Sequence, residues 1–154
     1  MKSLVSRVLS QQTGLLTLGI RVSLGCWFTY SGVTKILGGG LERFTRDIGN
    51  YQLVAPPLDA IAAYTVPWFE VAAGICLVLG FLRRGAILMV AGLVGVFAGC
   101  IGWAWAHHLD ISCGCHGGDA PIAYWNKVAE FAGYAVLLVW LWTHDRRATP
   151  IASR

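Results

Sequence analysis

Two cysteines and a histidine lie close together in the segment HHLDISCGCHGG, residues 107–118, and they are the side chains best suited to chemistry. One glycine separates Cys113 from Cys115, and His116 follows directly. A disulfide between the two cysteines would close a very small ring, and strain in such a ring makes the bond easier to reduce. Gly114 permits the unusual backbone angles that this ring requires, and a nearby imidazole stabilises a thiolate. The spacing therefore favours thiol–disulfide exchange.

The same segment has two other interpretations. Thiolates and imidazoles also suit copper(I) or zinc. The candidate metal ligands are Cys113, Cys115, His116, His107 and His108. A single intervening residue is short for a tetrahedral zinc site, whose cysteines usually have about two to four residues between them, so a metal is the less favoured alternative. The third interpretation is purely structural, a short staple or two unreactive thiols in a packed loop.

The composition indicates a membrane protein of one domain. Of the 154 residues, 56% are hydrophobic and 13% are charged, and the mean hydropathy is +0.59. A soluble domain has roughly 25% charged residues, so this chain has too few polar groups to cover a surface in water. The net charge of +4 comes from Lys and Arg at the ends of apolar segments, without a basic stripe. This distribution excludes a nucleic-acid partner and indicates a lipid bilayer.

Four stretches are long and apolar enough to cross a membrane, which takes about 20 residues. We expect spans at about residues 13–36, 58–82, 85–106 and 123–142. The long connection before the second span has apolar residues at helical spacing, which predicts an amphipathic helix on the membrane surface. The expected fold class is an all-α membrane protein, a four-transmembrane-helix bundle with a short amphipathic interfacial helix between spans one and two. The whole chain, 1–154, would form this domain.

The distribution of Lys and Arg predicts the orientation of the spans. One side would carry seven of them: Lys2, Arg7, Arg83, Arg84, Arg146, Arg147 and Arg154. The other side would carry three: Lys35, Arg43 and Arg46. Both termini are therefore expected in the cytoplasm of a bacterium, with the protein in the inner membrane. The cysteine segment would then face the periplasm, where disulfides form and persist.

Three stretches carry a resemblance to a known family. They are RVSLGCWFTYSGVTKI in the first span, PWFEVAAGICLVLGFLRRGA across the second, and CGCHGG before the fourth. Together they resemble the DoxX/MauE superfamily of small four-helix membrane proteins, over nearly the whole chain. The CGC triplet points to the MauE branch, whose loop usually reads CGCFG, with His116 here in the place of the aromatic residue. The resemblance implies methylamine dehydrogenase maturation and quinone-linked thiol or sulfur redox chemistry beside thioredoxin-like proteins.

Arg21 and Glu70 lie well inside the first and second spans, where a charge costs several kcal/mol unless it is paired. Their depths predict an ion pair between the two spans. Pro67 would kink the second span near the same level. Such a pair would either fix the register of the helices or line a quinone or proton pocket.

A polar face opens the fourth span, at helical spacing. Its residues are Asn126, Lys127, Glu130 and Tyr134. Trp103 and Trp125 are expected at the same level, either as part of an interfacial aromatic belt or as a flat slot for a quinone ring. In the slot, Lys127 or Asn126 would donate a hydrogen bond to the quinone carbonyl, and Glu130 would handle protons.

The remaining features are expected to serve packing. Glycines 92, 95, 99 and 102 lie on one stripe of the third span, which predicts a face where helices pack closely. Cys76 is expected to be a packing residue. Cys26 and Cys100 could form a second redox pair if their faces meet.

The leading hypothesis is a membrane subunit in quinone-linked thiol–disulfide redox chemistry. It would exchange electrons between a periplasmic thioredoxin-like or other redox protein and a quinone through Cys113 and Cys115. It would act either as the quinone-dependent thiol oxidoreductase itself or as the electron-relay subunit of one. The alternatives are a non-catalytic assembly or anchoring subunit, associated with other membrane subunits of a periplasmic or respiratory complex, and a membrane protein that handles copper or zinc.

Overall fold

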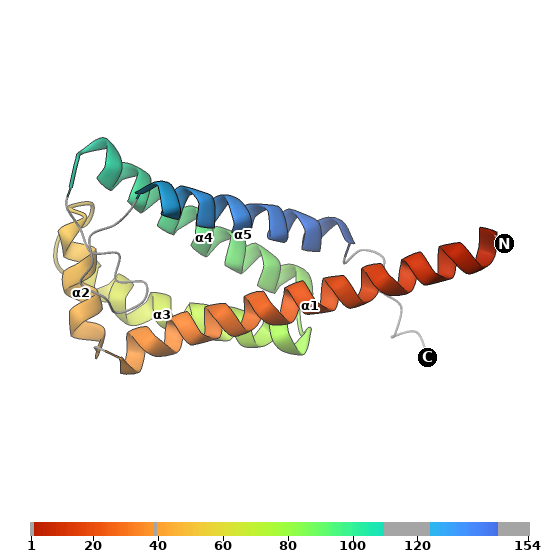
Figure 1. Cartoon of the computed structure of the whole chain (residues 1–154). Helices are drawn as coiled ribbons and strands as arrows, with labels where there is room; N and C mark the ends of the chain where they lie inside the picture. The colour runs from red at the N-terminus through yellow and green to blue at the C-terminus, as the bar shows by residue number, and fades with distance from the viewer. Residues whose placement is uncertain (1, 39, 110–123, 145–154) are drawn as a thin grey trace.

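The computed structural model describes residues 2–38, 40–109 and 124–144, with side chains from residue 14 onward. Its five helices are α1 Lys2–Leu37, α2 Gly40–Asn50, α3 Leu58–Leu79, α4 Arg83–Ala106 and α5 Tyr124–His144. The four long helices lie side by side, and the short α2 lies across one end of them (Figure 1). The start of α1 and the end of α5 lie toward the opposite end (Figure 1). The described part of the chain contains no strand, which confirms the all-α class and a separate helix between the first two long ones.

The helices begin and end close to the predicted positions, with two differences. α3 ends at Leu79, three residues before the predicted end, because Gly80 adopts a left-handed conformation with φ 73° and its N–H bonds to the Cys76 carbonyl. Glycine adopts this conformation without a steric cost. α1 begins at Lys2 and has 36 residues, which gives a length of about 54 Å at 1.5 Å per residue. It is therefore much longer than a hydrocarbon layer of about 30 Å.

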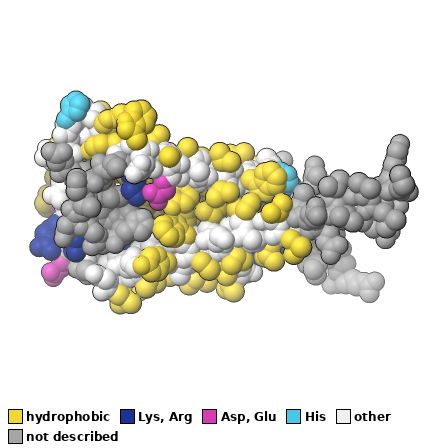
Figure 2. Space-filling view, in the orientation of Figure 1, with side chains coloured by type: hydrophobic (Ala, Val, Ile, Leu, Met, Phe, Trp, Pro, Cys, Tyr) yellow, Lys and Arg dark blue, Asp and Glu magenta, His cyan; other side chains and the backbone are white. Residues whose placement is uncertain are grey.

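Two helices in the described part of the chain, α3 and α4, are long and apolar enough to cross a membrane, with mean hydropathy of 1.6 and 2.2. α1 and α5 carry charged residues along their length, and their membrane crossing stays a prediction. On the face shown in Figure 2, charged side chains gather toward the end that carries α2, and apolar side chains cover much of the long helices.

Helices α1 and α3 form the most extensive helix pair, and glycines allow their backbones to approach. A Cβ on Gly25 would lie 2.7 Å from the Gly74 carbonyl oxygen and 2.6 Å from Val78 Cγ2. A Cβ on Gly74 would in turn lie 2.6 Å from the Gly25 carbonyl oxygen and would collide with the Thr29 hydroxyl. This close packing of small residues fixes how α1 and α3 face each other.

The glycine stripe predicted on α4 has a different environment. A Cβ on Gly92, Gly95, Gly99 or Gly102 would meet no atom within 4 Å in the described structure. No helix in the described part of the chain packs against this stripe, so the close helix contact stays a prediction. Instead, α4 contributes larger buried residues such as Ile87, Val90 and Val94 to the apolar core, which also contains Leu77 from α3 and Leu141 from α5.

Candidate functional site

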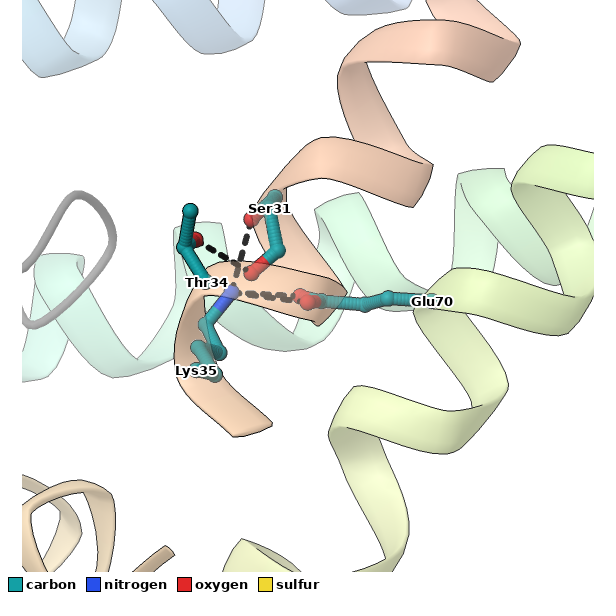
Figure 3. A network of polar contacts seen from close by, with 4 residues as sticks. All are labelled: Ser31, Thr34, Lys35 and Glu70. Atoms are coloured by element: carbon teal, nitrogen blue, oxygen red, sulfur yellow. Dashed lines mark hydrogen bonds and ion pairs between the residues drawn. The ribbon is translucent and has the colours of Figure 1, made fainter. Parts of the chain in front are cut away.

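An ion pair between Lys35 and Glu70 joins α1 to α3 (Figure 3). Lys35 Nζ lies 2.9 Å from Glu70 Oε1 and 2.7 Å from Glu70 Oε2, and it also donates to Ser31 Oγ at 2.8 Å. An ammonium group has three hydrogens, so each has an acceptor. The two side chains are 3% and 1% exposed. Because burying a charge costs free energy unless it is paired, each residue offsets part of the cost of burying the other.

Gly32 brings the two helices close enough for this ion pair. It lies one turn before Lys35, and a Cβ there would lie 2.6 Å from the Pro67 carbonyl oxygen and 3.1 Å from Glu70 Cβ. Pro67 is buried inside α3, three residues before Glu70. The absence of a side chain at Gly32 therefore lets the backbone of α1 approach α3 at the level of the Glu70 carboxylate.

A second ion pair lies on α5. Lys127 Nζ donates to Glu130 Oε2 at 2.7 Å, and the Tyr134 hydroxyl donates to Glu130 Oε1 at 2.8 Å. The three residues share a helix face because their spacing of three and four residues matches the helical repeat. The Lys127 and Glu130 side chains are 16% and 29% exposed. The predicted polar face is confirmed for these three residues.

The two ion pairs line one partly open cavity of about 40 Å³, to which four helices contribute residues. Its lining residues are Trp27, Phe28, Ser31, Lys35, Glu70, Val94, Phe97, Lys127, Glu130, Phe131 and Tyr134. A volume of this size accommodates one or a few water molecules, and it is too small for the ring of a quinone. Two ammonium groups and two carboxylates thus share one small polar space inside the bundle.

Aromatic rings form much of the remaining cavity wall. The Phe28 ring contacts the Tyr134 ring edge to face at 5.9 Å between centroids, and Phe131 does so at 6.4 Å. The Lys35 ammonium lies 5.2 Å from the Phe97 ring centroid, where the ring face attracts a cation. Apolar walls lower the local dielectric and strengthen the interactions between the charges inside.

The cavity contains side chains of the types that take up and release protons in proteins. The carboxylates of Glu70 and Glu130 and the hydroxyl of Tyr134 are groups that act as acids and bases in proteins. Glu130 is the more accessible carboxylate, and Tyr134 is hydrogen-bonded to it. Carboxylates from α3 and α5 therefore line the same cavity.

An apolar groove of about 730 Å³ lies between α1 and α5, next to the cavity. It is lined by Leu15, Leu16, Gly19, Ile20, Ser23, Leu24 and Leu137. Leu24 lies one turn before Phe28 on α1, and Leu137 lies one turn after Tyr134 on α5, so the groove ends where the cavity begins. Its volume is in the range of small-molecule sites.

The predicted ion pair between Arg21 and Glu70 is wrong, because Glu70 is paired with Lys35. The guanidinium of Arg21 lies beside Gly80, at the far end of α3. Ten residues separate Glu70 from Gly80, which corresponds to about 15 Å along the helix. Lys35 was expected to flank the first span, whereas α1 continues past it to Leu37 and places it inside the bundle.

The predicted quinone slot is assembled only in part. Among the described residues, Lys127 lines the cavity, whereas Trp103, Trp125 and Asn126 do not. The Trp103 ring stacks on the His107 ring, with 3.9 Å between the ring centroids. Trp125 is 74% exposed and contacts the Trp105 ring. Asn126 is exposed. Trp103, Trp105 and Trp125 therefore lie where α4 ends and α5 begins, outside the cavity.

Cys113, Cys115 and His116 lie outside the described residues. The chain on either side of them is joined by a hydrogen bond of 2.5 Å from the Tyr124 hydroxyl to the Leu109 carbonyl oxygen. His107 Nδ1 lies 3.0 Å from the Trp103 carbonyl oxygen. The metal interpretation and the disulfide interpretation both stay predictions.

The three cysteines inside helices have free thiols. Cys26 is exposed, and Cys76 and Cys100 are half-buried. No disulfide joins Cys26 to Cys100 in the structure, and their role as a second redox pair stays a prediction.

The model of one protein family matches this chain. It is the family described as methylamine utilisation protein MauE, and the match covers residues 13–144. The matched range includes both ion pairs, the groove and the Cys113–Cys115 segment. No curated protein and no solved structure matches this chain.

Proposed function

From the premise that this chain belongs to the MauE family of methylamine utilisation membrane proteins, we propose that it is the membrane subunit of a quinone-linked thiol–disulfide exchange. The exchange would take place at Cys113 and Cys115, on the periplasmic side of a bacterial inner membrane. The partner would be a thioredoxin-like or other periplasmic redox protein. Both chain termini would be cytoplasmic.

The cavity between the two ion pairs is the observation that carries the proposal. Oxidation of a dithiol releases two protons together with two electrons, so a membrane protein that oxidises thiols needs groups that move protons through its apolar interior. Glu70, Glu130 and Tyr134 supply such groups inside the bundle. Buried ionisable residues in a membrane helix indicate a functional site of this kind.

The thiol step uses the chain's own cysteines. A thiolate of the partner attacks one sulfur of the Cys113–Cys115 disulfide, and the other sulfur leaves as a thiolate. The second partner thiol then attacks the mixed disulfide, so the partner becomes oxidised and Cys113 and Cys115 become a dithiol. A short, strained ring favours this direction because opening it relieves the strain.

The groove between α1 and α5 fits the tail of a quinone, and the small cavity supports only the proton chemistry. The groove is apolar and ends at Phe28 and Tyr134, where Tyr134 and Glu130 could hold and pass a proton. A bound quinone would supply the acceptor for the two electrons and two protons of the dithiol. The exposed surface with Trp103, Trp125 and Asn126 is the second candidate place for the ring, with Lys127 at its border with the cavity.

The test uses purified full-length protein with a dithiol substrate and a water-soluble quinone. We expect dithiol-dependent quinone reduction by the wild type and its loss in Cys113→Ser and Cys115→Ser. Cys76→Ser is the matched control, since Cys76 is a half-buried thiol packed against the apolar core of the bundle, and it should retain activity. Full activity of Cys113→Ser would refute the proposal, and an inactive but folded wild type would favour a non-catalytic anchoring subunit.

A further inference from the structure

Lys35 lies close to the end of α1 and is nevertheless buried. The helix ends at Leu37, which is exposed, whereas the side chain of Lys35 is almost completely shielded from solvent. A lysine so near the end of a helix reaches water with its long side chain unless other residues cover the ammonium group. The burial of Lys35 therefore depends on what covers it at this end of the bundle.

Two aromatic rings from different helices flank the ammonium group. The Phe97 ring from α4 lines the cavity, and its centroid lies 5.2 Å from Lys35 Nζ. The Phe44 ring from α2 has its centroid 5.6 Å from the same atom, and among the described residues it does not line the cavity. Both ring faces attract the cation. Lys35 thus contacts the cavity wall through Phe97 and the short helix α2 through Phe44.

Phe44 is the one buried side chain of α2. The other residues of this helix are half-buried or exposed, and Glu42 and Arg46 are among the exposed ones. The helix is therefore amphipathic, with a polar side toward solvent and an apolar side toward the bundle. The buried contact on its apolar side is the contact over the Lys35 ammonium.

The connections on both sides of α2 leave it few buried contacts outside Phe44. Gly38 is exposed, and Gly40 begins the helix with φ 76°, a conformation that glycine adopts without a steric cost. Residues 52–57, which lead from α2 to α3, are exposed. Small residues at the end of an element are often the positions that absorb the change in backbone angles when a lid moves.

The two ion pairs of the cavity differ in how far solvent reaches them. Lys127 and Glu130 on α5 are partly exposed, whereas Lys35 and Glu70 are buried. Solvent therefore reaches the cavity at the α5 pair and is kept from the α1–α3 pair. Lys127 consequently provides an internal reference for any change that exposes Lys35 alone.

We propose that α2 is a lid over the Lys35–Glu70 ion pair, and that Phe44 is the side chain that keeps water from the ammonium group. Displacement of α2 connects the pair to the aqueous phase at that end of the bundle. The end of α4 and the start of α5 lie at the same end (Figure 1), and the segment between them in the sequence contains Cys113 and Cys115. The use of the lid in turnover rests on the proposed function, in which it controls when Glu70 releases a proton toward the thiols.

The test measures the reaction of lysine side chains with sulfosuccinimidyl acetate, a water-soluble acylating reagent, in detergent-purified full-length protein. Peptide mass spectrometry compares the acetylation rates of Lys35 and Lys127 at one pH, and we expect Lys35 to react more slowly in the wild type. Phe44→Ala should raise the ratio of the Lys35 rate to the Lys127 rate about tenfold, which corresponds to a loss of about 1.4 kcal/mol for the closed state. The measurement uses neither the thiols nor a quinone, so its failure would leave the proposed function standing.

Two further variants separate the lid from a general loosening of the bundle. Phe44→Leu keeps an apolar side chain but removes the ring face, so the ratio should rise about threefold, and this variant decides the test if Phe44→Ala fails to fold. Ile48→Ala truncates a half-buried residue one turn further along α2, and the ratio should stay at the wild-type value. An unchanged ratio in Phe44→Leu and in any folded Phe44→Ala would overturn the proposal. A rise in Ile48→Ala as large as that in Phe44→Ala would also overturn it, because the cover would then not depend on Phe44.

Discussion

Lys35 and Glu70 are 35 residues apart in the sequence, and the ammonium of one bonds both carboxylate oxygens of the other inside the bundle. The pair is isolated from solvent, and a second ion pair, Lys127 with Glu130, shares its cavity. The four side chains have no net charge in total. Each ion pair therefore reduces the desolvation free energy of the other in this apolar region. Removing one charge changes the electrostatic environment of the other three side chains.

Removing one partner of the buried pair should destabilise the protein strongly. Lys35→Met leaves the Glu70 carboxylate without its cation, and such a change costs about 3 to 5 kcal/mol in the free energy of unfolding. The double variant Lys35→Met with Glu70→Leu should recover most of that loss because no buried charge remains. Unfolding in detergent, monitored by tryptophan fluorescence, measures both. A double variant no more stable than Lys35→Met would contradict the ion-pair argument.

Glycines at the α1–α3 contact should be far more sensitive than those on the exposed face of α4. Gly32→Ala places a Cβ 2.6 Å from the Pro67 carbonyl oxygen, so the helices must separate, at a cost of about 1 to 3 kcal/mol. Gly95→Ala meets open space and should stabilise α4 by up to about 1 kcal/mol, since alanine favours the helix. Thermal unfolding midpoints compare the two, and equal effects would rule out the close contact.

Features set by local spacing could be predicted from the sequence. The polar face of Lys127, Glu130 and Tyr134 follows from their separation by three and four residues on one helix. The start of α3 at Leu58 and the end of α4 at Ala106 follow from where the apolar stretches begin and end. None of these depends on how one helix faces another.

The partner of Glu70 could not be predicted from the sequence, because it depends on the register between α1 and α3. Arg21 and Lys35 are 14 residues apart and lie on the same face of α1, so both point toward α3. Gly25 and Gly32 determine the contact, and the antiparallel register then puts Lys35 level with Glu70 and Arg21 level with Gly80. Counting how many residues separate each charged side chain from the end of its span does not reveal that register.

The hydroxyl of Tyr134 should matter for turnover more than for stability. Tyr134→Phe removes the hydrogen bond to Glu130 Oε1 and leaves the ring contacts with Phe28 and Phe131 in place. If Tyr134 and Glu130 exchange protons, dithiol-dependent quinone reduction should fall about tenfold or more, with the unfolding midpoint changed by only a few degrees. Tyr64→Phe, an exposed tyrosine on α3, should retain the wild-type rate. A Tyr134→Phe variant that is fully active would remove the cavity from the proton path.

Filling the groove between α1 and α5 should discriminate among quinones by tail length. Gly19 lines the groove and has no atom within 4 Å of its Cβ position, so Gly19→Leu fits there without a collision and occupies the apolar space. The KM for a quinone with a long isoprenoid tail should rise about tenfold, which corresponds to the loss of the binding free energy of about two buried methylene groups. The KM for a quinone without a tail should be unchanged.

Gly14→Leu is the matched control, because Gly14 also faces open space but does not line the groove. Steady-state kinetics with both quinones measure the two KM values. An equal change in KM for the two quinones would show that the tail does not bind in this groove. The surface around Trp125 would then be the favoured site.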